Sequence, residues 1–178
     1  MRVEVRHYVQ NQMAETPEYK QVLKIALDLL NLLNTDRVLA SIDNANQPGA
    51  SSSDVQKAFR TEAHCLGFKD ESKGLFQGYK SNGLRPDYFK KLKGTGIILE
   101  VERGKTTMNN MDLLDFWKCH ICAHAHYLFL LVPVKLVQNN TAKVGARNEF
   151  ASVNNRLATF FLKESNYTSV RGLSIFGY

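Results

Sequence analysis

Three acidic residues in the middle of the chain have the types and the spacing that can hold a metal ion. Asp87 follows a proline, and Glu100 and Glu102 come thirteen and fifteen residues later, with a single residue between them. Because side chains alternate along a β-strand, Glu100 and Glu102 are expected to project from the same face. If Asp87 lies on the preceding strand of a hairpin, its carboxylate comes within cross-strand distance of the pair. Without such a neighbour, a Glu-x-Glu pair is most typical of a solvent-facing strand.

Carboxylates gathered at one point repel one another, and their pKa values rise unless a cation neutralises them. Carboxylate oxygens are hard ligands that suit Mg²⁺, with Mn²⁺ as the other candidate. Such an ion lowers the pKa of a bound water molecule and stabilises a leaving oxyanion, which is what hydrolysis of a phosphodiester requires. The sequence therefore predicts a metal site formed by Asp87, Glu100 and Glu102.

Positive charge is concentrated in the same stretch of the chain. The 178 residues have a formal charge of +6, and residues 73–105 contain eight basic and three acidic side chains. A polyanion such as DNA fits this distribution, while the alternative is a set of ordinary solvated lysines. The residues that we expect to contact DNA are Lys90, Lys91, Lys93, Arg103 and Lys118.

The acids need a hairpin to bring them together, and the residue pattern predicts one. Alternating residues indicate a first strand over 84–90 and a second over 97–103, and the glycines within residues 93–96 indicate the turn between them. The apolar residues of the second strand would then point away from the two glutamates.

Further helices and strands are predicted around this hairpin from apolar periodicity and capping residues. The expected helices cover about residues 17–34, 54–66, 110–125 and 150–160, and the expected strands cover residues 127–132 and 170–176. The continuous apolar run of the first of these strands is typical of burial on both faces.

Together these elements predict one domain of the α/β (α+β) class, with a mixed central sheet flanked by helices. Residues 1–67 are expected to form a helical N-terminal part. Residues 83–134 would form the core of hairpin, helix and strand, and residues 146–178 would add the last helix and strand.

The order of these motifs resembles the PD-(D/E)xK nuclease superfamily, which has the restriction-endonuclease-like fold. The resemblance rests on Pro86-Asp87, on Glu100-Val101-Glu102 at the end of an apolar strand, and on the helix and buried strand that follow. It covers roughly residues 62–134, about two fifths of the chain. It implies a Mg²⁺-dependent endonuclease of the restriction type that cleaves double-stranded DNA and holds its metal with Asp87 and Glu100.

One position departs from the pattern of that family. A lysine usually stands where this chain has Glu102, and the variant with an acid there resembles restriction enzymes of the BamHI and BglII type. The attacking water is then oriented either by Glu102 itself or by Lys105 from the following turn, which can also stabilise phosphate. The family tends to place an assisting glutamate on a helix before the hairpin, and Glu62 matches it. Because cleavage of both strands needs two active sites, a homodimer is expected.

Two groups of residues after the hairpin allow more than one interpretation. Cys119 and Cys122 lie close to three histidines, but a helix lacks the turn of a zinc knuckle, so small core residues are favoured over a zinc site. Trp117 falls on the apolar stripe of its helix and is expected in the core. Asp115 and Lys118 lie on the other side of that helix, where a solvated lysine is favoured over one that faces the metal site.

Composition and missing motifs narrow the functional classes. Three cysteines, an odd number, indicate a reducing compartment, so we expect a cytoplasmic protein. The longest apolar run is too short for a bilayer, so no membrane partner is expected. The chain has no Walker-type phosphate loop, nucleophile elbow or dinucleotide fingerprint. Two alternatives to a nuclease stay open: an inactive nucleic-acid-binding module of the same fold, and a protein-interaction domain whose basic face meets an acidic partner.

Overall fold

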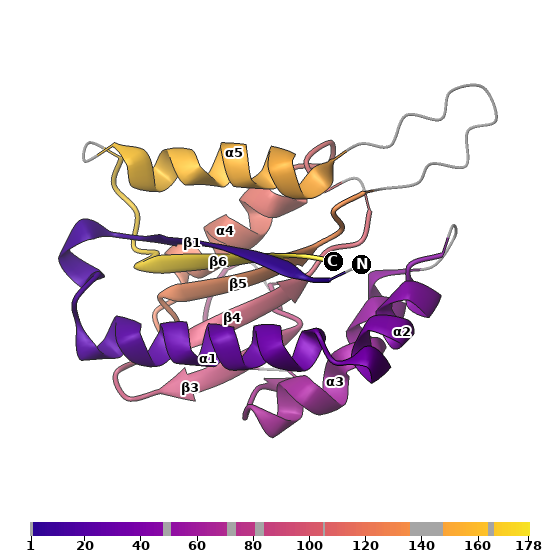
Figure 1. Ribbon diagram of the computed structural model, residues 1–178. Coiled ribbons are helices and arrows are strands. Elements are labelled where there is room, and N and C mark those ends of the chain that lie inside the picture. The colour runs from indigo at the N-terminus through magenta and orange to yellow at the C-terminus, as the bar shows by residue number, and fades with distance from the viewer. Residues whose placement is uncertain are drawn as a thin grey trace.

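A six-stranded mixed sheet with helices on both faces forms the framework of the molecule (Figure 1). The computed structural model describes residues 2–47, 51–70, 74–80, 84–104, 106–135, 148–163 and 166–178. This architecture confirms the predicted α/β (α+β) class.

Strands and helices alternate from residue 95 to the end of the chain, whereas the first half has consecutive helices followed by consecutive strands. The helices are the short 3₁₀-helix η1 (Asn11–Met13) and the α-helices α1 (Pro17–Leu33), α2 (Asp36–Ala45), α3 (Ser52–Cys65), α4 (Met111–Ile121) and α5 (Glu149–Leu162). The strands are β1 (Glu4–Val9), β2 (Lys69–Asp70), β3 (Tyr88–Leu92), β4 (Thr95–Val101), β5 (Tyr127–Val132) and β6 (Gly172–Gly177).

The sheet has a parallel centre and antiparallel flanks. Its strands lie in the order β1-β6-β5-β4-β3-β2, and β4, β5 and β6 are parallel to one another. β1 pairs antiparallel with β6, β3 with β4, and β2 with β3. Helix α4 links β4 to β5, and α5 follows β5 before the chain enters β6. The carboxyl ends of the three parallel strands therefore lie along one edge of the sheet, at the right in Figure 1.

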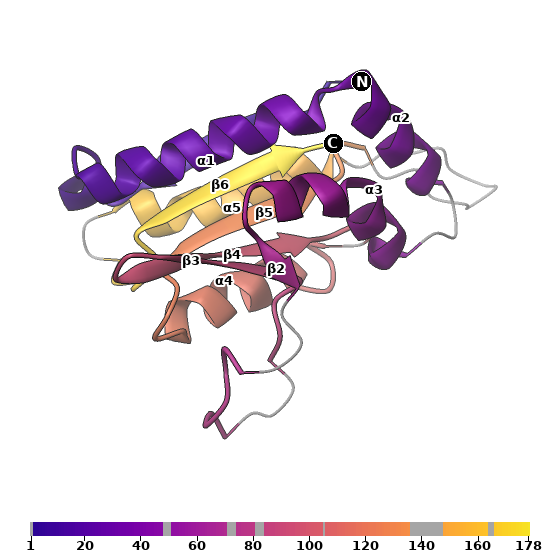
Figure 2. The same ribbon diagram turned by 90° about the horizontal axis from the view of Figure 1, so that it is seen from below.

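Two apolar cores, one on each face of the sheet, hold the helices in place (Figure 2). Leu99 of β4 belongs to the core shared with α1 and α3, whereas its neighbour Ile98 belongs to the core shared with α4 and α5. This alternation follows from the two-residue period of a strand. All six residues of β5 are buried, which confirms the predicted strand that is covered on both faces.

The predicted hairpin is present, with a tighter turn. Leu92 pairs with Thr95, so only Lys93 and Gly94 form the loop, and Gly94 has a φ of 78° that favours glycine. The turn was expected to extend to Gly96, which instead belongs to β4. Both strands are therefore shifted relative to the prediction: β3 begins after Asp87, and β4 ends before Glu102.

Four elements were not predicted: η1, α2, β1 and β2. Helix α2 buries Val38 and Ile42, which are spaced at i, i+4, and its other residues are half-buried or exposed. β1 makes the expected helical N-terminal part begin with an edge strand, and β2 has only two residues. None of the helices in the described residues is long and apolar enough to cross a bilayer.

Gly96 is a position where the hairpin tolerates no side chain. A Cβ there would lie 2.4 Å from the ring of Phe89 and 2.8 Å from the backbone oxygen of His124. We expect Gly96→Ala to lower the free energy of unfolding by about 1–3 kcal/mol, the usual cost of overpacking. Urea unfolding measures this loss. Gly104→Ala is the control, because a Cβ at Gly104 meets nothing within 4 Å, and an equal loss in both variants would contradict the packing account.

Candidate active site

Two hydrogen bonds tie Asp87 to the end of β4. The backbone N–H of Asp87 donates to Oε2 of Glu100 at 3.0 Å, and Oδ2 of Asp87 accepts from the backbone N–H of Val101 at 2.8 Å. Because Tyr88 pairs with Leu99, Asp87 stands opposite Glu100 at the end of the hairpin. The structure thus brings the aspartate next to the first glutamate, at the carboxyl edge of the parallel strands.

Helix α4 adds two charged side chains that the sequence assigned to the solvated side. Nζ of Lys118 lies 2.6 Å from Oε1 of Glu100 and 2.8 Å from Oδ1 of Asp115. Lys118 is only 8% exposed and Asp115 is fully buried. The expectation of a solvated lysine is wrong, because α4 turns the side that carries Asp115 and Lys118 toward Glu100 of β4. An ammonium buried in this way is also no surface contact for DNA.

Glu102 stands one residue beyond β4, and its backbone is fixed from two sides. Its N–H donates to the carbonyl oxygen of Leu131 in β5, and its carbonyl oxygen accepts from the hydroxyl of Tyr178, both at 2.8 Å. Burial raises the pKa of its half-buried carboxyl group, and Asp115 is close enough for its charge to raise that pKa further. Glu102 therefore belongs to the same cluster, which we call the carboxylate cluster: Asp87, Glu100, Glu102, Asp115 and Lys118.

Four carboxyl groups and one ammonium make the carboxylate cluster electrically unbalanced. Burial raises the pKa of Asp87 to about 6, although the charge of Lys118 acts in the opposite direction. Burial, with the negative charges of Asp115 and Asp87, raises the pKa of Glu102 to about 8. Burial and the charge of Asp115 also raise the pKa of Glu100. The cluster therefore either retains protons near neutral pH or takes up a further cation.

The ammonium remains charged within this cluster. Burial by itself would lower the pKa of Lys118, but the negative charges of Glu100 and Asp115 and their hydrogen bonds raise it. Lys118 is thus the cation that the fold itself places among the carboxylates.

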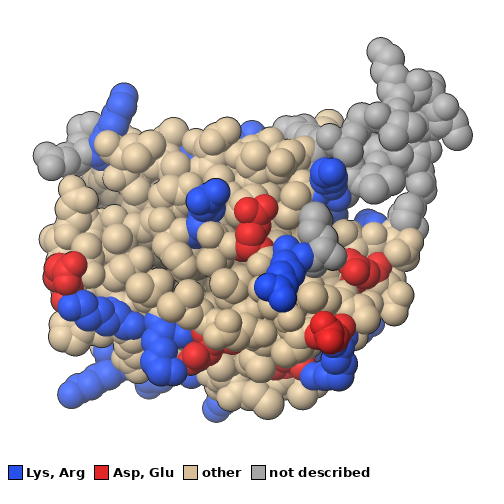
Figure 3. Space-filling view, in the orientation of Figure 1, with Lys and Arg blue, Asp and Glu red and all other residues tan. Residues whose placement is uncertain are grey.

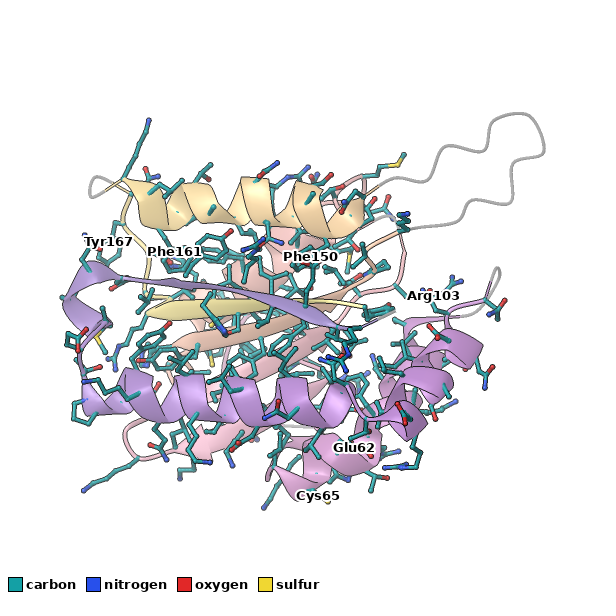
Figure 4. All side chains as sticks on the ribbon, in the orientation of Figure 1. Glu62, Cys65, Arg103, Phe150, Phe161 and Tyr167 are labelled. Carbon is teal, nitrogen blue, oxygen red and sulfur yellow. The ribbon has the colours of Figure 1, made fainter. Side chains whose placement is uncertain are left out.

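Glu62, the predicted helper, does not join the carboxylate cluster. It is buried on α3 and forms an ion pair with the guanidinium of Arg37 from α2, in the region labelled in Figure 4. The α3 side chain that reaches Asp87 is Gln56, which hydrogen-bonds to its carboxylate. Six residues separate Gln56 from Glu62, roughly 120° around a helix, so the two side chains face different neighbours. The other predicted helper, Lys105, lies outside the described residues.

The basic residues predicted to contact DNA are mostly far from the acids. Lys91 and Lys93 follow Asp87 by four and six residues, which is roughly 13 and 20 Å at about 3.3 Å per residue. Lys90 donates to the carbonyl oxygen of Leu66 at 2.5 Å and so helps to end α3. Lys91 and Lys93 therefore do not surround the carboxylates, because the hairpin turn lies at the opposite end of β3 from Asp87. Across the face shown in Figure 3, basic and acidic side chains are interspersed.

Arg103 is the exception among these basic residues. It follows Glu102 directly and donates to the carbonyl oxygen of Gln47 beyond α2. Its label in Figure 4 lies at the same end of the molecule as α2, on the opposite side from Tyr167.

Around α4, one interpretation is confirmed and one is wrong. Cys119 and Cys122 are buried small residues of the core under α4, as favoured from the sequence. Trp117, expected in the core, is 43% exposed instead. The orientation of α4 about its own axis explains why Trp117 is exposed. The helix turns Asp115 and Lys118 toward the sheet, and Trp117 therefore faces solvent.

Comparison with known proteins adds no relative. The chain matches no protein-family model, and no curated protein shows significant similarity to it. The function is therefore inferred from the residues and the geometry of the carboxylate cluster.

The donor set of the carboxylate cluster suits a hard divalent cation. Its carboxylate oxygens are the ligands that Mg²⁺ prefers, and their raised pKa values indicate negative charge that one ammonium leaves uncompensated. Among the described residues, no three acidic, histidine or cysteine side chains already converge as a set of metal ligands. Lys118 instead lies against Glu100. A divalent ion at Asp87 and Glu100 would thus replace protons and share Glu100 with the ammonium.

Removing the buried ammonium of Lys118 should destabilise the folded protein, because the carboxylates around it then repel one another. We expect Lys118→Met to lower the free energy of unfolding by about 3–5 kcal/mol at pH 8, because the carboxylates lose the one cation that the described residues place against them. The loss should shrink as the pH falls and the carboxyl groups take up protons. Urea unfolding of the metal-free protein at both pH values measures it. Lys91→Met, on an exposed lysine, is the control, and equal losses in the two variants would contradict the proposed role of Lys118.

The carboxyl group of Glu102 should make stability depend on pH. Its pKa is about 8 in the folded chain against an ordinary 4.5, so the stability that its proton provides is lost as the pH rises from about 4.5 to 8. Glu102→Gln removes this titration. We therefore expect the melting temperature of the variant to rise relative to the wild type over that range, by about 2–4 °C per kcal/mol. The melting temperatures of both proteins are measured across this pH range in the presence of a chelator. A difference between them that stays constant with pH would refute the raised pKa of Glu102.

Proposed function

We propose that the protein is a Mg²⁺-dependent endonuclease that hydrolyses phosphodiester bonds of double-stranded DNA, of the restriction-endonuclease-like kind. The observation that carries this proposal is the pairing of Asp87 with Glu100 inside a buried cluster that has more carboxylates than cations. The elements around it support the family resemblance, because a hairpin is followed by a crossover helix and a buried parallel strand.

In this proposal Asp87 and Glu100 hold Mg²⁺, and Mn²⁺ can replace it. When bound, the ion would acidify water and neutralise charge on the phosphate. Glu102 accepts the proton of the attacking water, because a neighbouring cation lowers its pKa and leaves the carboxylate ionised. Tyr178 and Leu131 keep the backbone of Glu102 in place while it does so.

We further propose that Lys118 supplies the ammonium that the family pattern places on the strand at the position of Glu102. It approaches Glu100 from α4 instead of from β4. Its charge offsets part of the negative charge that develops at the phosphate, and its contact with Glu100 orients that ligand.

One observation favours a second candidate, an inactive DNA-binding module of the same fold. The ammonium of Lys118 contacts Glu100 and Asp115 and so acts as an internal counter-ion. A protein that no longer binds a metal ion would still need this ammonium to balance the buried carboxylates. This module would bind DNA with a strong dependence on salt but with none on Mg²⁺. A homodimer and a cytoplasmic location remain predictions for either candidate.

Incubation with supercoiled plasmid DNA and Mg²⁺ or Mn²⁺ tests the enzyme directly. We expect nicked and linear products from the wild type, none in EDTA, and at least a hundredfold slower cleavage by Asp87→Asn and Glu100→Gln. Glu62→Gln is the matched control, because this buried carboxylate lies outside the cluster, and it should cleave at the wild-type rate. Equal rates for the wild type and Asp87→Asn would overturn the site, and binding without cleavage under all conditions would favour the second candidate.

A further inference from the structure

A polar pocket opens beside Asp87, between α3 and the start of β3. Its volume is about 410 Å³, and one wall is the face of α3 that carries Ser53, Gln56, Lys57 and Arg60. The spacing of these residues, i, i+3, i+4 and i+7, puts them on a single side of the helix. The opposite wall is the segment 85–88, so the aspartate of the carboxylate cluster also lines this pocket.

The pocket is lined by three basic side chains whose charges are unequally compensated. Arg60 is paired with Asp70 at 2.5 Å, so its charge is largely balanced. Lys57 is 3.9 Å from Asp54 and mostly exposed, which leaves its ammonium weakly paired. Arg85 is exposed and has no ion-pair partner within the described part of the chain. Two cations beside Asp87 are therefore available to an anion.

We propose that this pocket binds the phosphate groups that neighbour the cleaved phosphate on the same DNA strand. Arg85 and Lys57 are the side chains that bind them. This inference rests on the proposed function and specifies how the substrate reaches the site. A phosphate bound through the proposed cation at Asp87 would continue into a backbone whose neighbouring charges need cations within a few ångströms, and the pocket provides them. Gln56, which contacts Asp87, and Ser53 add neutral hydrogen-bonding groups between the two cations.

The basic residues of the hairpin turn are poorer candidates for the same task. Lys91 and Lys93 are separated from Asp87 by most of β3, and Lys91 lines a different pocket with Phe89 and His124. Any DNA contact that they make would leave the strand far from the carboxylates. Arg85, by contrast, is two residues from Asp87 along the chain.

The test compares two double variants with the same change in charge. Fluorescence anisotropy with a labelled DNA duplex, in Ca²⁺ to suppress cleavage, measures affinity at several salt concentrations. We expect Lys57→Gln/Arg85→Gln to weaken binding at least tenfold and to reduce the slope of log K against log salt by about 2, because each phosphate contact contributes about 0.9. Lys91→Gln/Lys93→Gln should bind like the wild type. Thermal melting of both variants confirms that they are folded.

Two failures can be told apart. If the wild type binds and cleaves DNA but the two double variants bind alike, the proposed path of the strand is wrong and the nuclease proposal stands. If the wild type neither binds nor cleaves DNA, the proposed function is wrong and the inference falls with it. A weaker and less salt-dependent interaction in the pocket variant alone supports the inference.

Discussion

Burying several carboxyl groups around a single ammonium is the constraint on which the rest of the site depends. The ammonium of Lys118 contacts two of these groups, Glu100 and Asp115, and the remaining negative charge must be balanced by protons or by a bound cation. A fold that needed only stability would not retain such a cluster, since apolar residues of similar volume would serve at least as well. We therefore propose that the arrangement is a binding site, formed at a cost in stability.

The framework explains how so much charge is held in place. The hairpin register sets Asp87 opposite Glu100, and backbone hydrogen bonds fix both residues. Helix α4 returns along the face of β4 and presents its charged side, while Tyr178 anchors the residue that follows β4. The hairpin, one crossover helix and the C-terminal residue thus meet at the edge where parallel strands end, a common location of ligand sites in such sheets.

The sequence predicted the elements with strong periodicity and the pairing of Asp87 with Glu100, because a hairpin leaves few alternatives. It did not predict α2 or β1, because both segments are short and bury few residues, even though Val38 and Ile42 of α2 are spaced as in a helix. It also placed the charged face of α4 in solvent, because polarity alone normally indicates exposure. The spacing of Asp112, Asp115 and Lys118 on one helical face, directly after the acidic strand, was the signal that would have identified the missing site residues. The sequence also could not show that the lysines near the hairpin turn lie far from the carboxylates, because this distance depends on where β3 begins and ends.

The uptake of a divalent cation by the carboxylate cluster is the central claim, and anomalous diffraction from crystals soaked in Mn²⁺ tests it most directly. We expect a strong anomalous peak in contact with carboxylate oxygens of Asp87 and Glu100, and no such peak in Asp87→Asn crystals grown in the same way. Wild-type crystals at pH 8 with no peak there, and with Lys118 still as the only cation beside Glu100, would contradict it.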